Sequence, residues 1–316
     1  MRYGEFAWQI LKRKTSTRSF VLGTRLFIVG LAKKLLIANT LAMPADAIFE
    51  LAPSDLTAPI AWLGVICYTL QIYFDFSGYS DMAIGLGRMF GFKIPDNFNH
   101  PYTATSITDF WRRWHITLSR WFRDYLYFPL GGSRGSAFRT YFNLFTVFLL
   151  CGFWHGASWN FLLWGLLHGA YLSFERIGFG RVLARLPSPV AMAYTVSMVM
   201  LGWVFFQCRS VEHGFTYLSV MFGQTFGSRT FYELHDLCTY DVLMAFGVAV
   251  LASGGFFRTA RQSLAGWLRG SMNRSKRRGR AAGLRFIGHA LLLLLFIACC
   301  IRISADTYTP FLYFRF

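Results

Sequence analysis

The sequence predicts an all-α, polytopic integral membrane protein, and two observations lead to that fold class. Of the 316 residues, 54% are hydrophobic and 15% are charged, whereas a soluble domain typically carries about 25% charged residues. The basic residues behind the net charge of +17 gather in blocks between long uncharged stretches, as they do in the cytoplasmic loops of membrane proteins. Together these features disfavour a soluble enzyme, a disordered chain, a disulfide-stapled secreted module and a nucleic-acid-binding protein.

The uncharged stretches predict the membrane segments in chain order, because a spanning helix needs roughly 17–25 residues. These stretches are 56–74 with 19 residues, 140–174 with 35, 186–208 with 23, 242–257 with 16, and 286–301 with 16. The two 16-residue stretches reach spanning length when flanking side chains snorkel to the interface. With the longest stretch folded into two arms and one weaker segment before the first, the count is about seven to eight.

The weaker segment, Leu26–Ala45, carries Lys33 and Lys34 in its middle. Two adjacent cations at bilayer depth are costly, so we expect this helix to be tilted, broken or shielded by protein. Further along, Asp75 and Asp81 stand among glycines and serines at the end of an apolar stretch. These acids are expected to cap backbone amides or to pair with arginines.

The loops alternate in charge, which predicts their orientation by the positive-inside rule. The assignment of the loops to the two sides of the membrane is consistent only if the stretch 140–174 enters from the cytoplasm and returns to it. Two full spans and a turn need about 40 residues, so at least one arm should be short, tilted or re-entrant. The basic segments, placed in the cytoplasm, are 1–18, 112–139, 176–185 and 258–285, and the acidic segments, placed outside, are 46–55 and 233–241.

His155 is the first candidate for chemistry, because it lies near the middle of the 35-residue stretch, in CGFWHGASWNFLLWGLLHG. A neutral imidazole is tolerated in a membrane, and its ordinary pKa near 6.5 suits proton transfer. The plainer alternative is a core histidine bonded to a helix carbonyl. On a continuous helix Trp159 would share its face, whereas His168 would point away and serve a structural role. The side chains expected to form the pocket are Trp154, Trp159, Asn160 and Trp114.

His115 is the second candidate, in the aromatic and basic segment TDFWRRWHITLSRWFRDYLYFPLGG. The plainer interpretation is an amphipathic helix at the cytoplasmic interface, with tryptophan as belt residues and arginine meeting lipid phosphate. The alternative is that this element carries His115 towards a site fed by a phosphate-bearing donor such as coenzyme A, since arginine binds phosphate well. The arginines expected to contact that phosphate are Arg112, Arg113, Arg120 and Arg123.

Other chemistries lack their motifs. The sequence has no GxSxG elbow, Walker loop, HExxH or zinc-ligand spacing, which disfavours a serine or metal hydrolase and predicts no metal site. The 6 cysteines fall mainly in apolar stretches and are expected to act as small buried residues.

Three segments carry a family resemblance. They are FDFSGYSDMAIGLGRMFGFKIPDNFNHPY at 74–102, DFWRRWHITLSRWFRDYLYFPLGG at 109–132, and WHGASWNFLLWGLLHG at 154–169. With the closing TPFLYFRF, they resemble the membrane-bound O-acyltransferase (MBOAT) family, in its branch of alginate O-acetyltransferase membrane subunits. Teichoic-acid D-alanyl transfer proteins are similar at a greater distance.

The resemblance implies an acetyltransferase in which His155 is the general base and His115 occupies a position that is Asn or His across the family. It further implies transfer from a cytosolic thioester, acetyl-CoA or an acyl carrier, through a tunnel to an acceptor outside, with no bound cofactor. The implied acceptor is an exported polysaccharide, alginate first. Implied partners are a periplasmic acetyltransferase and a polysaccharide synthesis and export complex, around a multi-pass protein of the bacterial inner membrane.

The resemblance also frames the domain prediction. Residues 1–316 are expected to form one MBOAT-like helical bundle, corresponding to the C-terminal two-thirds of the family pattern and lacking its N-terminal helices, with 258–285 as a basic cytoplasmic loop. Two alternatives stay open from the sequence. One is a transporter or channel that uses the His and Arg residues as a proton or anion path, and the other is a truncated, inactive acyltransferase.

Overall fold

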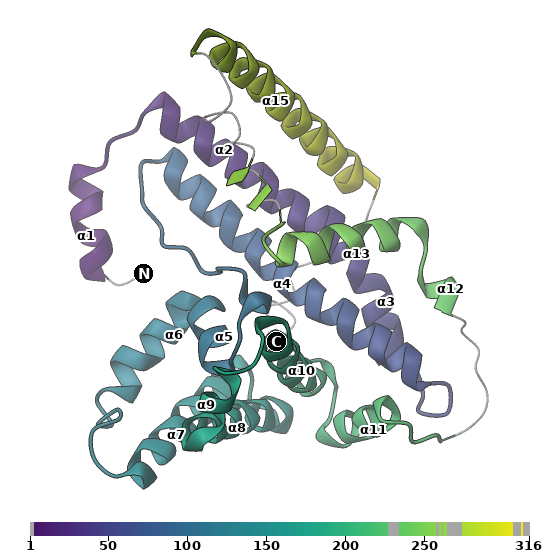
Figure 1. Ribbon diagram of the computed structural model, residues 1–316. Helices are drawn as coiled ribbons and strands as arrows, with labels where there is room; N and C mark the ends of the chain where they lie inside the picture. Colours follow the sequence, from purple (N-terminus) through teal and green to yellow (C-terminus); the bar gives the residue numbers. More distant parts are fainter. Residues whose placement is uncertain are drawn as a thin grey trace. The chain divides into compact units, whose positions relative to one another are not determined.

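The computed structural model describes residues 3–226, 234–256, 259–260, 262–263, 274–305 and 311, and every regular element in these ranges is helical (Figure 1). This confirms the all-α prediction. The elements of the first half are α1 (Tyr3–Lys12), α2 (Thr17–Ala32), η1 (Lys33–Ala38), α3 (Asn39–Phe49), α4 (Ala58–Met89), η2 (Pro101–Thr103), α5 (Ile107–Arg113), α6 (Ile116–Phe122) and η3 (Arg123–Tyr127). Those of the second half are α7 (Ala137–His155), α8 (Trp159–Phe174), η4 (Glu175–Phe179), α9 (Gly180–Leu183), α10 (Ser188–Gln207), α11 (Val211–Met221), α12 (Leu234–Leu237), α13 (Tyr240–Ser253) and α15 (Arg274–Ala305).

The membrane segments fall largely where the uncharged stretches predict them. Among the described residues, 4 helices are long and apolar enough to cross a membrane: α4, α7, α10 and residues 283–305 of α15. In the stretch 242–257, residues 242–253 belong to the shorter apolar helix α13, and residue 257 lies outside the described residues. Within 258–285, residues 258, 261 and 264–273 lie outside the described residues, and the part from Arg274 onward is the start of α15. The orientation of these helices stays a prediction.

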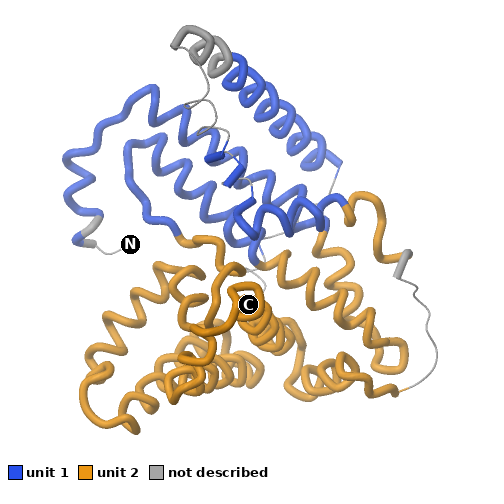
Figure 2. The backbone as a smooth tube through the Cα atoms, in the orientation of Figure 1, with its two compact units in different colours: residues 1–40, 73–96, 244–315 blue, residues 41–72, 97–243, 316 orange. Residues whose placement is uncertain are grey.

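The chain divides into two compact units, drawn in different colours in Figure 2. Unit 1 comprises residues 1–40, 73–96 and 244–315, and unit 2 comprises 41–72, 97–243 and 316. Helix α4 belongs to unit 2 in its first half and to unit 1 in its second half.

Unit 1 is built on close packing between α2 and the second half of α4. A Cβ atom placed on Gly23 would lie 2.5 Å from the Gly85 carbonyl oxygen, and one on Gly30 would lie 2.6 Å from the Gly78 carbonyl oxygen. Each helix thus presents glycine seven residues apart, and the backbones touch at both positions. Small residues that admit close backbone approach are a usual means of helix packing in membranes.

The same contact pairs the two lysines with the two acids of α4. Lys33 Nζ lies 2.6 Å from Asp81 Oδ2, and Lys34 Nζ lies 2.5 Å from Asp75 Oδ1. The expectation that protein shields the lysines is confirmed, and the helix continues through them as the π-helical turn η1. Pairing with arginines was expected for these acids, whereas among the described residues their ion-pair partners are the two lysines of η1.

Unit 2 contains the hairpin predicted from the 35-residue stretch. Ser136 caps α7 by accepting a hydrogen bond from the Arg139 amide, and α7 ends at His155. The chain turns at Gly156–Ser158, and α8 returns over 16 residues, which is shorter than a comfortable span. The two arms pack along each other, and α10 lies against α8.

We predict that the Lys34–Asp75 pair is a main determinant of the stability of unit 1. Its side chains are 8% and 4% exposed, and removal of one partner from a buried pair costs about 3–5 kcal/mol. Asp75→Asn should therefore lower the thermal unfolding midpoint measured by fluorescence-detected size exclusion in detergent. Asp81→Asn should lower it less, because that pair is 23% and 22% exposed.

A double replacement, Lys34→Met with Asp75→Leu, should recover most of the lost stability, because no charge then stays buried alone. Wild-type stability of the Asp75→Asn protein would contradict this account of the pair.

Candidate active site

The site in unit 2 begins with a carboxylate that caps α5. Glu175, 6% exposed at the start of η4, accepts hydrogen bonds from the backbone N–H groups of Ile107 at 2.6 Å and Thr108 at 3.1 Å. The Thr108 hydroxyl donates a third bond to it, at 2.9 Å. A helix N-terminus has free N–H groups and favours negative charge. One carboxylate therefore anchors the element that carries the basic and aromatic residues before His115.

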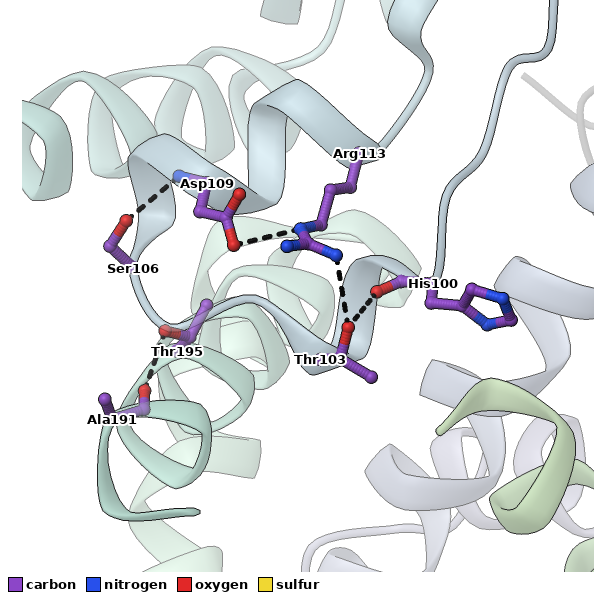
Figure 3. Close-up of polar contacts among 7 residues, drawn as sticks. All are labelled: His100, Thr103, Ser106, Asp109, Arg113, Ala191 and Thr195. Atoms are coloured by element: carbon purple, nitrogen blue, oxygen red, sulfur yellow. Dashed lines mark hydrogen bonds and ion pairs between the residues drawn. The ribbon is translucent and has the colours of Figure 1, made fainter. Parts of the chain in front are cut away.

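A second set of polar contacts fixes the remainder of α5, as Figure 3 shows. The Ser106 hydroxyl accepts from the Asp109 amide at 3.0 Å, and Arg113 Nε donates to the Asp109 carboxylate at 2.9 Å. Arg113 also donates to the Thr103 hydroxyl at 3.3 Å, which in turn donates to the His100 carbonyl at 2.8 Å. Arg113 is thus engaged in holding the loop between η2 and α5.

His115 lies in the link between α5 and α6 with a left-handed backbone, φ 41°, a conformation that is uncommon outside glycine. Asn97 holds the chain there, since its carbonyl accepts from the Ile116 amide at 3.0 Å and its side chain accepts from the Thr117 amide and hydroxyl. Burial lowers the pKa of His115 to about 3, so the ring is neutral at pH 7. Burial of the neutral His115 ring therefore contributes to folding stability above the unfolded pKa of about 6.5, and this contribution is lost as the pH falls towards 3.

His155, at the end of α7, is 9% exposed and enclosed by aromatic rings. Its ring centroid lies 4.9 Å from Trp154, 5.1 Å from Trp164 and 5.1 Å from Phe206. Trp154 also contacts His115, with ring centroids 6.2 Å apart. The two predicted imidazoles therefore both contact the same indole ring.

His168 joins the same cluster, and the expectation that it points away from His155 is wrong. Trp164 contacts both histidines, with its centroid 4.9 Å from His168. The Trp111 indole N–H donates to His168 Nδ1 at 3.3 Å, which leaves the proton of the neutral ring on Nε2. The prediction assumed one continuous helix, whereas the turn at Gly156–Ser158 reverses the chain and resets the helical register.

The four predicted pocket residues lie in different surroundings. Trp154 contacts both His115 and His155, as described above. Trp159 begins a new helix with 79% of its surface exposed and does not wall off His155. Asn160 donates from Nδ2 to the Cys208 carbonyl at 2.5 Å, tying the start of α8 to the end of α10. Trp114 is buried against Phe110 and Trp203 in the core of unit 2.

A cleft of about 620 Å³ opens between the α5–η3 segment and the hairpin. Its inner wall is apolar and includes Val147, Phe148 and Cys151 of α7, and Cys151 lies one helical turn before His155 on the same face. Arg112, Arg120 and Arg123 line it, whereas Arg113 does not. Among the described residues, Arg123 pairs with Asp124, and no acid forms an ion pair with Arg112 or Arg120.

The cluster combines imidazole rings, surrounding aromatic side chains and a neighbouring cleft lined by arginines. Such a site can accept a proton from a hydroxyl and can hold an anionic, partly apolar molecule. In the part of the chain that the structure describes, no group of 3 or more His, Cys, Asp or Glu side chains could hold a metal ion.

Sequence reasoning missed Trp164, Phe206 and Glu175. Gly152 lies before the turn and Gly165 after it. If these glycines had been interpreted as a close contact between antiparallel arms, that contact would have placed Trp164 near His155. Glu175 is a lone acid at the end of an apolar stretch, which signals a buried partner without indicating which one. Phe206 had no signal beyond its apolar surroundings.

Comparison with known proteins adds a family and several relatives. The sequence model of the MBOAT, membrane-bound O-acyltransferase family, matches residues 1–210. The probable alginate O-acetylase AlgI of Pseudomonas putida is 41% identical over 326 residues, covering 100% of this chain and 65% of the relative. The corresponding protein of Azotobacter vinelandii is 39% identical, covering 100% of this chain and 66% of the relative.

A peptidoglycan O-acetyltransferase of Helicobacter pylori is 47% identical over 210 residues, covering 65% of this chain and 40% of the relative. The chain thus spans about two thirds of the length of the alginate relatives it matches.

We predict that the Glu175 carboxylate determines the position of α5 and, through it, of His115. Glu175→Gln replaces one carboxylate oxygen with an N–H₂ group, which cannot accept hydrogen bonds from Ile107 and Thr108. A hydrogen bond to a charged group is worth about 1.5–3 kcal/mol. The variant should show a lower unfolding midpoint and lower transfer activity per folded molecule. Thr108→Val, which removes one of the three bonds, should have a smaller effect in the same direction.

Glu50→Gln is the matched control, because Glu50 pairs with Arg209 at an exposed position, 63% and 79% exposed. If the Glu175→Gln and Glu50→Gln proteins behaved alike, the capping role would be refuted.

Proposed function

The chain belongs to the membrane-bound O-acyltransferase family, and from that premise we propose that it transfers an acetyl group from a cytosolic thioester towards an exported polysaccharide. The observation that carries the proposal is the enclosure of His155 by aromatic rings beside a cleft with a cationic lining. The relatives named for alginate and peptidoglycan acetylation support an extracytoplasmic polymer as the final acceptor. Alginate is the first candidate among such polymers.

In the proposed reaction, a ring nitrogen of His155 accepts the proton of the acceptor hydroxyl as its oxygen attacks the thioester carbonyl carbon. The carbon–sulfur bond breaks, the acetyl group moves to the oxygen, and the departing thiolate takes up the proton. No covalent acyl-enzyme is required. His115, neutral because of its burial, is proposed to help orient the donor across Trp154, which it shares with His155.

We assign the donor to the 620 Å³ cleft. Its apolar wall suits the acyl and pantetheine portions of acetyl-CoA or of an acyl carrier, and Arg112 and Arg120 suit the phosphate. Arg123, which pairs with Asp124, is a secondary contact, and Arg113 is left out because it pairs with Asp109. We further propose a multi-pass location in the bacterial inner membrane with this cleft on the cytoplasmic side, because the basic segment 112–139 favours that orientation.

The proposed partners follow from the position of the acceptor. A periplasmic acetyltransferase would take the acetyl group to the polymer, alongside the polysaccharide synthesis and export complex. The protein's own contribution is to carry the acyl group from the donor side of the bilayer to the acceptor side.

We predict that His155→Ala and His155→Gln both abolish polymer acetylation, with a loss of about 10²–10⁴-fold in rate, because neither side chain can act as the base. The measurement is ester-linked acetate on the exported polymer, determined by NMR in a host that lacks its own polymer acetyltransferase. Values are normalised to folded protein in the membrane.

His213→Gln is the matched control, because that imidazole lies on α11 against Tyr217 and outside the histidine cluster. A purely structural His155 would be rescued by Gln, which can still form hydrogen bonds. A well-accumulated, active His155→Gln protein would therefore disprove the proposed base.

A further inference from the structure

Unit 1 contains a second cavity, of about 310 Å³, that the proposed function does not use. It lies where the start of α2 meets the end of α4, and we refer to it as the Lys14 pocket. Its polar lining consists of Lys14, Ser19, Arg88 and Lys93. The remaining lining residues are Ile84, Gly91, Phe92 and Ile94.

The fold builds this pocket with specific contacts. Helix α4 ends with the amides of Gly91 and Phe92 bonded to the carbonyls of Arg88 and Gly87, a glycine-terminated cap with Gly91 at φ 83°. A Cβ atom on Gly91 would lie 3.0 Å from the Lys14 carbonyl oxygen. The close approach of these two backbones brings Lys14 to the end of α4.

Helix α1 fixes the other side of the loop. The Gln9 side chain accepts from the Lys93 amide at 2.7 Å and donates to the Lys93 carbonyl at 3.4 Å. Phe92 stacks on Phe6 with centroids 4.9 Å apart, and the Arg13 guanidinium lies 4.8 Å from its ring centroid. The two Gln9 hydrogen bonds go to the backbone of Lys93 and do not engage its ammonium group, which lines the pocket.

The positive charge of the pocket favours the binding of an anion. Three cations line a space without an acidic side chain, and among the described residues none of the three forms an ion pair. The first turn of α2, capped by Ser16, adds the positive end of a 16-residue helix beside Ser19. Like charges gathered around a cavity repel one another unless an anion joins them.

We propose that the Lys14 pocket binds the phosphate group of an anionic phospholipid. The exposed apolar residues Phe20, Val21 and Leu22 follow Ser19 directly along α2, so acyl chains can lie on that helix while the headgroup occupies the pocket. A cavity of 310 Å³ has the volume of about ten water molecules of roughly 30 Å³ each, which is sufficient for a phosphate with part of a headgroup. The basic segment 1–18 places the pocket at the cytoplasmic leaflet, where anionic lipids gather.

The test uses the full chain purified in detergent, with native mass spectrometry to count the phospholipids that stay bound. Phosphatidylglycerol and phosphatidylcholine are titrated against the wild type and against the triple variant Lys14→Gln, Arg88→Gln, Lys93→Gln. The control triple is Arg176→Gln, Arg181→Gln, Arg185→Gln, which removes the same charge from exposed positions in unit 2. A calorimetric titration with inorganic phosphate distinguishes a lipid headgroup from a soluble phosphate.

Each basic residue near an anionic headgroup contributes about fivefold to binding. The pocket variant should therefore bind phosphatidylglycerol about a hundredfold more weakly, and the control should stay close to wild type. If the wild type bound inorganic phosphate, the pocket variant alone lost that binding, and phosphatidylglycerol were not preferred over phosphatidylcholine, the pocket would be a phosphate site. That result would overturn the proposal that the phosphate belongs to a lipid. Equal losses in both triples, or no anion binding by the wild type, would overturn the site itself.

The single variants Arg88→Gln and Lys93→Gln keep the test decisive if the triple variant does not accumulate. Neither change alters the Gln9 contacts or the glycine cap, because these contacts use only the backbone groups of Lys93 and Arg88. Each should weaken phosphatidylglycerol binding about fivefold, and unchanged binding by both would refute the pocket.

Discussion

The backbone contact between the two arms of the hairpin is the constraint on which the site depends. A Cβ atom on Gly152 would lie 2.2 Å from the Phe161 carbonyl oxygen, and one on Gly165 would lie 2.2 Å from that of Phe148. Only glycine permits arms this close. Their separation determines where Trp164 meets His155 and where His168 meets Trp111, which links the hairpin to α5.

Lipid imposes a second constraint, because hydrocarbon offers no partner to a polar group and each must be satisfied within the protein. Glu175 accepts hydrogen bonds from three donor groups of α5, and Lys34 forms an ion pair with Asp75. Both contacts join residues far apart in the sequence, so they stabilise the fold and also determine which elements lie side by side. In unit 2 that arrangement positions the strained backbone of His115.

Much of the fold could be predicted from the sequence, because span length and charge distribution are local properties. The hairpin and its short arm follow from counting residues in an uncharged stretch, and the shielding of Lys33 and Lys34 follows from the cost of two cations at bilayer depth. The site was predictable only in part. His155 and His115 share Trp154 as neighbours, whereas the position of Trp159 and His168 depended on a three-residue break that resets helical register. The partner of Glu175 and the engagement of Arg113 are long-range contacts with no periodic signal.

Close packing of the hairpin arms holds His155 in the position that the proposed transfer requires. Gly152→Ala tests it, since a real Cβ at that position would force the arms apart. The control is Gly247→Ala, a helical glycine of α13 with open space around its Cβ position. Ester-linked acetate on the exported polymer, per folded protein, should fall at least about tenfold for Gly152→Ala and stay near wild type for Gly247→Ala. Equal acetylation by the two variants would contradict the claim.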